Sequence, residues 1–152
     1  MRKWITAAVL GLLCAGGAAN ARGQGSGDGA AGVIRGRQAA MMLSGVAMGS
    51  IKASIDAGQA PASQRFNTRA LARWAHAVPG MFPAGGDAGV PTKAKPEVWS
   101  DRAGFEARAA DYAAAADRLA ELAAGEDAAA FAAQWAVVRQ SCNACHTTYK
   151  AD

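Results

Sequence analysis

The sequence predicts an all-α protein, an antiparallel four-helix bundle. Alanine is very abundant and β-branched residues are few, a composition that favours helix. Apolar residues recur at helical spacing in four segments, which glycine and proline separate. Short connections join the first two segments and the last two, and a long one joins the middle pair. This is the pattern of an up-and-down bundle with one longer crossing.

Residues 1–21 have the pattern of a secretory signal peptide. Arg2 and Lys3 form a basic start, residues 5–15 an apolar stretch, and Ala19-Asn20-Ala21 a small-residue cleavage site. The apolar stretch is too short and too interrupted for a membrane-spanning helix. We therefore expect a protein exported to the periplasm by a cleavable signal, with no membrane anchor.

Little net charge remains when this segment is removed. Arg2 and Lys3 account for two of the 16 basic residues, and the others nearly balance the 12 acidic ones. No basic run with interleaved aromatic residues indicates nucleic-acid binding. The glycine-rich residues 22–32 should form a flexible leader, so a single folded domain should occupy residues 33–152.

Two helices are predicted before the long connection. The first follows an inward stripe of Ile34, Met41, Met48, Ile51 and Ile55, and it should end near Gly58. The second should be capped by Ser63 and closed by Pro79 and Gly80. Its predicted inner positions are Phe66, Ala70 or Leu71, Trp74 and Val78.

Two more helices follow the connection, which spans residues 81–98. Ser100 should cap the third, whose inward positions are Phe105, Ala109, Tyr112, Ala116, Leu119 and Ala123. Asp127 should cap the fourth, whose stripe comprises Phe131, Trp135, Val138, Cys142, Cys145 and Tyr149. A connection as long as residues 81–98 usually carries function.

The most informative stretch is Cys142-Asn143-Ala144-Cys145-His146, near the C-terminus. Its two thiols and one imidazole have the spacing that attaches haem covalently. On a helix these three side chains project from one face, so they can hold one flat ligand. The thiols can add to the porphyrin vinyl groups, and His146 can take an axial position on the iron. We expect one covalent haem c.

Three other interpretations of the same motif are weaker. A structural zinc site needs about four ligands, and besides the motif the chain has only one other histidine, His76, and one other cysteine, Cys14, which lies in the predicted signal peptide. A thioredoxin-like redox pair would lie near a βαβ pattern, which is missing from the sequence. A structural disulfide is the third alternative. His76 has polar neighbours and should be a surface residue.

The chain resembles the cytochrome c prime family, the class II c-type cytochromes, in which haem is attached near the end of a four-helix bundle. The matching stretches are Arg37-Gln38-Ala39-Ala40-Met41, residues 92–99 (TKAKPEVW) and residues 142–146. The resemblance covers residues 33–150. The C-terminal position of the motif makes it specific, because class I cytochromes carry the motif near the N-terminus.

The resemblance implies roles for five further residues. Arg37 would pair with a haem propionate, Met41 would face the distal side of the iron, and Phe82, Pro96 and Trp99 would pack near the haem. Many family members have arginine where this chain has Lys150, which on a continuing helix would share the face of His146. Lysine lacks the planar guanidinium fork, so the chain departs from the family here, and a role that depends on this fork does not carry over to Lys150. The resemblance also suggests a homodimer through the first two helices.

Two functions fit these residues. In the first, His146 is the sole protein ligand, and the open iron binds small gases such as nitric oxide or carbon monoxide, with associated electron transfer to redox partner proteins. In the second, Met41 is the sixth ligand and the protein is an electron carrier. A methionine on an inward stripe more often fills the core than binds a metal, which favours the first. No catalytic constellation indicates an enzyme.

Overall fold

The computed structural model describes residues 21–84, 86 and 89–152. The predicted signal peptide therefore lies outside the described residues except for Ala21. Four long helices are present, namely α1 (Ala21–Asp56), α2 (Arg65–Ala77), α4 (Arg102–Leu122) and α5 (Ala128–Tyr149). Three single turns complete the elements, namely η1 (Pro61–Gln64), η2 (Val78–Met81) and the short α3 (Glu97–Ser100).

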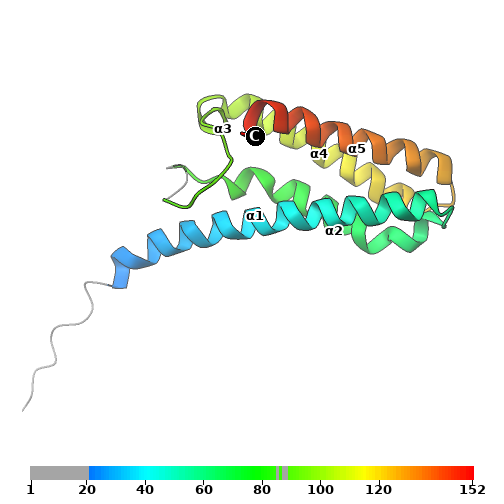
Figure 1. The fold of residues 1–152 in the computed structure, drawn as a ribbon, viewed down its shortest axis with the longest axis horizontal. Helices are drawn as coiled ribbons and strands as arrows, with labels where there is room; N and C mark the ends of the chain where they lie inside the picture. The colour runs from blue at the N-terminus through cyan, green and yellow to red at the C-terminus, as the bar shows by residue number, and fades with distance from the viewer. Residues whose placement is uncertain (1–20, 85, 87–88) are drawn as a thin grey trace, which may run out of the picture.

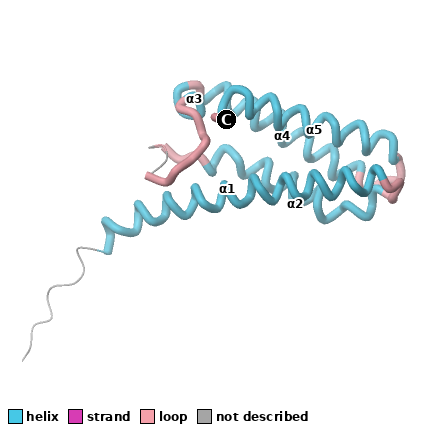
Figure 2. Tube along the Cα trace, in the orientation of Figure 1, coloured by secondary structure: helices cyan, strands magenta, loops and turns pink. Residues whose placement is uncertain are grey.

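The four long helices form an antiparallel bundle, as the sequence predicted (Figure 1). α1 packs against α2, α2 against α4, α4 against α5, and α5 against α1. The connection between α2 and α4 lies at the same end of the bundle as the C-terminus, where most of the loop residues gather (Figure 2). An isolated bridge between Ala94 and Lys150 joins this connection to the chain end. The motif near the C-terminus is therefore placed beside the long connection.

α1 begins earlier than the sequence predicted. The glycine-rich residues 22–32 continue the helix instead of forming an irregular leader before Val33. Extending a helix that has already formed avoids the unfavourable nucleation step. This offsets part of the backbone entropy that glycine loses in a helix. The end of α1 is as predicted, since Gly58 follows it with a φ of 64°.

The prediction for the start of the second helix was wrong. Pro61 begins the turn η1, and Gln64 rather than Ser63 stands at the N-cap of α2. The Ser63 hydroxyl instead lies 3.0 Å from the Ser54 hydroxyl of α1. This shift turns Phe66 outward, with 82% of its surface exposed, while Leu71 and Val78 are buried as predicted.

α4 and α5 follow the predicted stripes closely. All six predicted inward residues of α4 are buried, and so are Phe131, Val138 and Tyr149 of α5. Asp127 caps α5, because its carboxylate accepts the backbone N–H of Ala130 at 2.9 Å. The predicted cap of α4 was wrong by one residue, because Ser100 belongs to α3 and Asp101 accepts the backbone N–H of Gly104 at 3.2 Å.

Within the described residues, no helix is long and apolar enough to cross a membrane.

The adjacent residues Val137 and Val138 test the orientation of α5. Val138 is fully buried, whereas 47% of Val137 is exposed. We predict that Val138→Ala lowers the free energy of unfolding by about 2 kcal/mol, because it removes buried methyl groups and leaves a cavity. Val137→Ala should change it by less than about 0.5 kcal/mol. Denaturant unfolding of both variants measures the difference, and equal losses would contradict this orientation.

Candidate functional site

The predicted motif lies in the last two turns of α5. Cys142 and Cys145 are half-buried on the face that packs into the bundle, and both thiols are free. His146 stands beside them at the exposed edge of this face. Because these positions are three and four residues apart, their side chains share one side of the helix. The structure thus brings the three predicted attachment residues together.

Burial raises the pKa of both thiols. For Cys142, burial is the main cause, and hydrogen bonds with the backbone and with the Ser141 side chain lower the pKa in part. For Cys145, burial is again the main cause, the nearby Cys142 adds to it, and Arg108 opposes it. Both groups are therefore neutral thiols near neutral pH.

The pKa of His146 is lowered. Shielding of its ring from water is the larger cause, and the positive charge of Lys150 is the second. A lowered pKa keeps the imidazole neutral at physiological pH, which is the form that binds a metal ion. His146 is therefore chemically suited to be an axial ligand.

Arg37 lies on α1, and its contacts are with the long connection. Only 3% of its surface is exposed, so it is not a solvated surface residue. Its guanidinium donates to the Met81 carbonyl at 2.8 Å and to the Thr92 hydroxyl at 3.1 Å, and it lies 4.0 Å from the centroid of the Phe82 ring. Burial lowers its pKa. In the described residues no carboxylate pairs with it, so its charge lacks a counter-ion.

Met41 is one turn along α1 from Arg37. It is partly buried and packs against the core, as Met48 does further along the helix. The Ser44 hydroxyl, on the next turn, donates to the Ala40 carbonyl at 2.8 Å. Burial is the main cause of the raised pKa of Tyr112 on α4, the nearby Cys142 adds to it, and the nearby Ser44 opposes it, so α1, α4 and the first attachment residue of α5 lie close together. Met41 is therefore on the inward stripe, as predicted.

Phe82, Pro96 and Trp99 come together in the long connection. They line a hollow of about 870 Å³. The other predicted site residues do not contribute to its lining. Phe82 is buried, with its ring centroid 6.5 Å from that of Trp99. The Trp99 indole N–H donates to the Pro83 carbonyl at 2.8 Å, which fixes the connection. Phe82 links this cluster to the rest of the site through its contact with Arg37.

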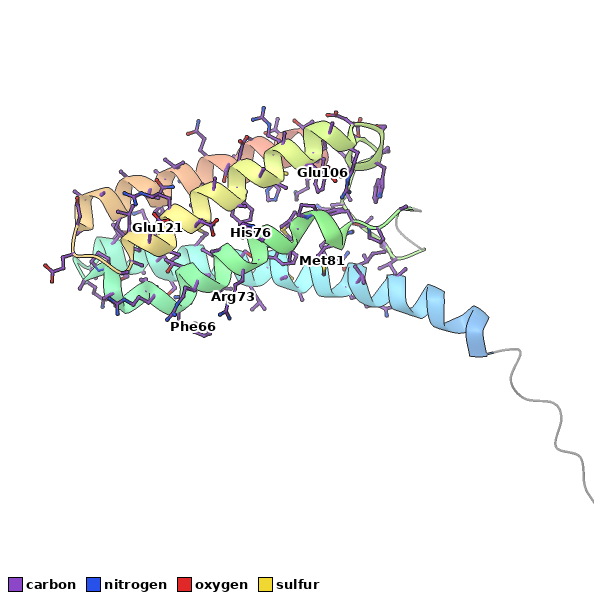
Figure 3. All side chains as sticks on the ribbon, turned by 180° about the vertical axis from the view of Figure 1, so that it is seen from behind. Phe66, Arg73, His76, Met81, Glu106 and Glu121 are labelled. Atoms are coloured by element: carbon purple, nitrogen blue, oxygen red, sulfur yellow. The ribbon has the colours of Figure 1, made fainter. Side chains whose placement is uncertain are left out.

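His76 is on the surface, as predicted. Its ring nitrogen lies 2.9 Å from a carboxylate oxygen of Asp117, and 62% of its side chain is exposed. Figure 3 shows it on α2, on the side that faces α4. In the part of the chain that the structure describes, no three His, Cys, Asp or Glu side chains form a metal site. The zinc interpretation therefore finds no ligand set here.

The expected position of Lys150 was wrong. α5 ends at Tyr149, and Lys150 is extended, with a φ of −121° and a ψ of 134°. Its side chain donates to the Ala151 carbonyl at 3.1 Å. Pairing with Ala94 pulls the chain out of the helix at this residue. Lys150 therefore does not continue the face of His146, although its charge still reaches the imidazole.

The sequence reasoning missed the polar residues that support the site. Thr92 accepts from Arg37, Gln38 donates to the Pro91 carbonyl at 2.8 Å, and Asp101 accepts from the Tyr149 hydroxyl at 2.7 Å. Only Asp101 had a local signal, an aspartate just before an amphipathic segment. The partners of the other two are far away in the sequence, so no spacing could indicate them.

These residues fit a covalently bound haem. Two neutral thiols and a neutral imidazole share one face of α5. A buried guanidinium that no described carboxylate pairs with suits a propionate, because an arginine fork can pair with a carboxylate through two hydrogen bonds. Cys142, Cys145 and His146 could hold the porphyrin and its iron, and Arg37 could hold a propionate.

Comparison with known proteins gives consistent results. The family model described as Cytochrome C' matches residues 32–150. Cytochrome c-556 of Agrobacterium tumefaciens is 33% identical over 124 residues, which cover 79% of this chain and 98% of that protein. Cytochrome c' of Rubrivivax gelatinosus is 42% identical over 69 residues, which cover 45% of this chain and 54%, about half, of that protein.

Solved structures show the same architecture. Cytochrome c' from Thermochromatium tepidum superposes with a TM-score of 0.74 at 32% identity, covering 81% of this chain and 97% of the other. A second solved cytochrome c', described as having a ligand-controlled dimer dissociation, gives a TM-score of 0.75 at 28% identity, with the same coverage of 81% and 97%.

Proposed function

Because the chain belongs to the cytochrome c' family, whose members bind haem c, we propose that Cys142 and Cys145 attach the haem and that His146 ligates its iron. The haem supplies a redox-active iron that can bind diatomic gases. The thiols fix the porphyrin to α5 through thioether bonds. Arg37 neutralises a propionate from α1, and Met41, Phe82, Pro96 and Trp99 form apolar surroundings that exclude water.

The position of His76 supports a five-coordinate iron. It is the only histidine besides His146, and its pairing with Asp117 on the outer surface leaves the site with one imidazole. His146 then holds the iron from one side, and the inward residues of α1 face the other. Met41 offers no hydrogen bond from that side, which suits ligands that need none, such as nitric oxide and carbon monoxide.

The second candidate function is electron transfer by an iron with two protein ligands. Met41 favours it, because this side chain is inward and carries a thioether that can bind iron. A methionine at such a position more often fills irregular space between helices. We therefore place gas binding with associated electron transfer first, and a His146/Met41 electron carrier that serves redox partner proteins second.

Export to the periplasm is part of the same proposal. Residues 1–21 carry the basic start, apolar stretch and cleavage site of a signal peptide. Haem would be attached to Cys142 and Cys145 after export, because the chain has no twin-arginine pair for export of a folded protein.

We also propose a homodimer that uses the outer faces of α1 and α2. Large apolar side chains are exposed there, with exposed fractions of 74% for Met42, 66% for Leu43, 68% for Val46 and 82% for Phe66. Figure 3 shows Phe66 pointing away from the bundle. Exposed apolar patches of this kind are typical of interaction sites. The dimer dissociation described for one relative supports a partner of the same kind.

Covalent attachment is tested by extraction with acidified acetone. We predict that haem stays with the wild-type protein and that the Cys142→Ala, Cys145→Ala double variant releases it. Ser141→Ala serves as the control, because it changes a neighbouring residue of α5 without removing a thiol. Free extraction of haem from the wild-type protein would contradict the proposed attachment.

Met41→Ala tests the choice between the two functions. If Met41 only crowds the distal side, this variant should bind carbon monoxide about tenfold more tightly, since a gain of about 1.4 kcal/mol corresponds to tenfold. The spin state of the resting iron should not change. Val137→Ala, at an exposed position on α5, should leave affinity unchanged. A resting iron that becomes high-spin only in Met41→Ala would make Met41 the sixth ligand.

Val46→Glu tests the dimer. A charge on this exposed apolar face would meet its own copy across a twofold interface, and we predict a dimer dissociation constant at least about tenfold higher. Val137→Glu, which adds the same charge to an exposed position on α5, should leave the dimer intact. Sedimentation equilibrium measures both variants. If both variants weakened the dimer equally, or if the wild-type protein were monomeric, this interface would be excluded.

A further inference from the structure

Three residues from two helices meet beside the turn that carries His146. Asp101 caps α4 by accepting the backbone N–H of Gly104 at 3.2 Å. Its other carboxylate oxygen accepts the Tyr149 hydroxyl at 2.7 Å. Tyr149 is the last residue of α5 and only 6% of its surface is exposed. A single aspartate therefore joins the start of α4 to the end of α5.

Gly104 provides the space for this contact. A Cβ at this position would overlap the Asp101 carboxylate and would lie 2.7 Å from the Tyr149 hydroxyl oxygen. Glycine within a helix is otherwise unfavourable, because it loses more backbone freedom than alanine on folding. Its presence in the first turn of α4 is explained by the hydrogen bond that a larger residue would displace.

Further contacts hold the same turn in place. The Tyr149 ring lies edge-on to Phe105, with centroids 5.4 Å apart. The Tyr149 carbonyl accepts the backbone N–H of Lys95 at 3.0 Å, and Ala151 donates to the Lys93 carbonyl at 2.8 Å. The Lys150 N–H closes the last helical bond to the His146 carbonyl at 3.1 Å. The backbone of His146 is thus connected directly to this anchored segment.

We propose that Tyr149 is a positioning residue for the haem ligand His146, acting through its hydrogen bond to Asp101 in the space left by Gly104. This inference rests on the proposed role of His146 as the iron ligand. The hydroxyl bond holds the final turn of α5 against α4, and this turn sets the direction of the imidazole three residues earlier. An imidazole held by a rigid turn meets the iron at one fixed orientation.

The experiment uses the haem-loaded protein and two variants that break the contact differently. Tyr149→Phe keeps the ring against Phe105 and removes only the hydroxyl. Gly104→Ala keeps both partners and fills the space between them. We expect the iron–histidine stretching band of the reduced protein, measured by resonance Raman spectroscopy, to shift or split in both. In the double variant the band should shift no further than in the more affected single variant, because both substitutions break the same contact.

Asp127→Ala is the matched control. It removes the equivalent cap of α5 at the other end of the helix, so it should lower thermal stability and leave the band unchanged. A band that is unaltered in Tyr149→Phe, or that moves equally in Asp127→Ala, would overturn the positioning role alone. Absence of an iron–histidine band in the wild-type protein would instead overturn the role of His146, and the inference with it.

Discussion

The structure depends on one face of α5 that serves both the core and the cofactor site. Phe131 and Val138 bury this face between the other helices, and Cys142, Cys145 and Tyr149 continue the same stripe toward the C-terminus. Because the stripe is continuous, the two thiols lie on the face of α5 that packs into the bundle. In the proposed site, haem attached there would contact the core, and the packing of the helices would set its surroundings.

A second constraint comes from the buried charge of Arg37. Placing a guanidinium in the interior without a carboxylate is costly, and neutral acceptors such as the Met81 carbonyl compensate for it only in part. In the proposed site, a haem propionate beside Arg37 would supply the negative charge that none of the described carboxylates provides. The same residue contacts Phe82, so it also holds the long connection over α1.

The sequence predicted the helices well where local patterns decide the structure. Neighbours within a few residues determine the inward positions of α4 and α5 and the cap at Asp127. The spacing of the attachment motif is local in the same way. The errors arose where distant contacts decide. Ser63 pairs with Ser54 rather than capping α2, Phe66 turns outward after the turn that Pro61 begins, and Lys150 leaves the helix to pair with Ala94. The partners of Arg37 are 44 and 55 residues away, beyond any spacing argument.

The proposed site holds haem on α5 with His146 as the only protein ligand of its iron. The optical spectrum of the purified protein, recorded in both oxidation states, tests this proposal. We expect a c-type haem that is high-spin and five-coordinate when oxidised and when reduced. A spectrum without c-type haem, or one that is low-spin in both states, would contradict it.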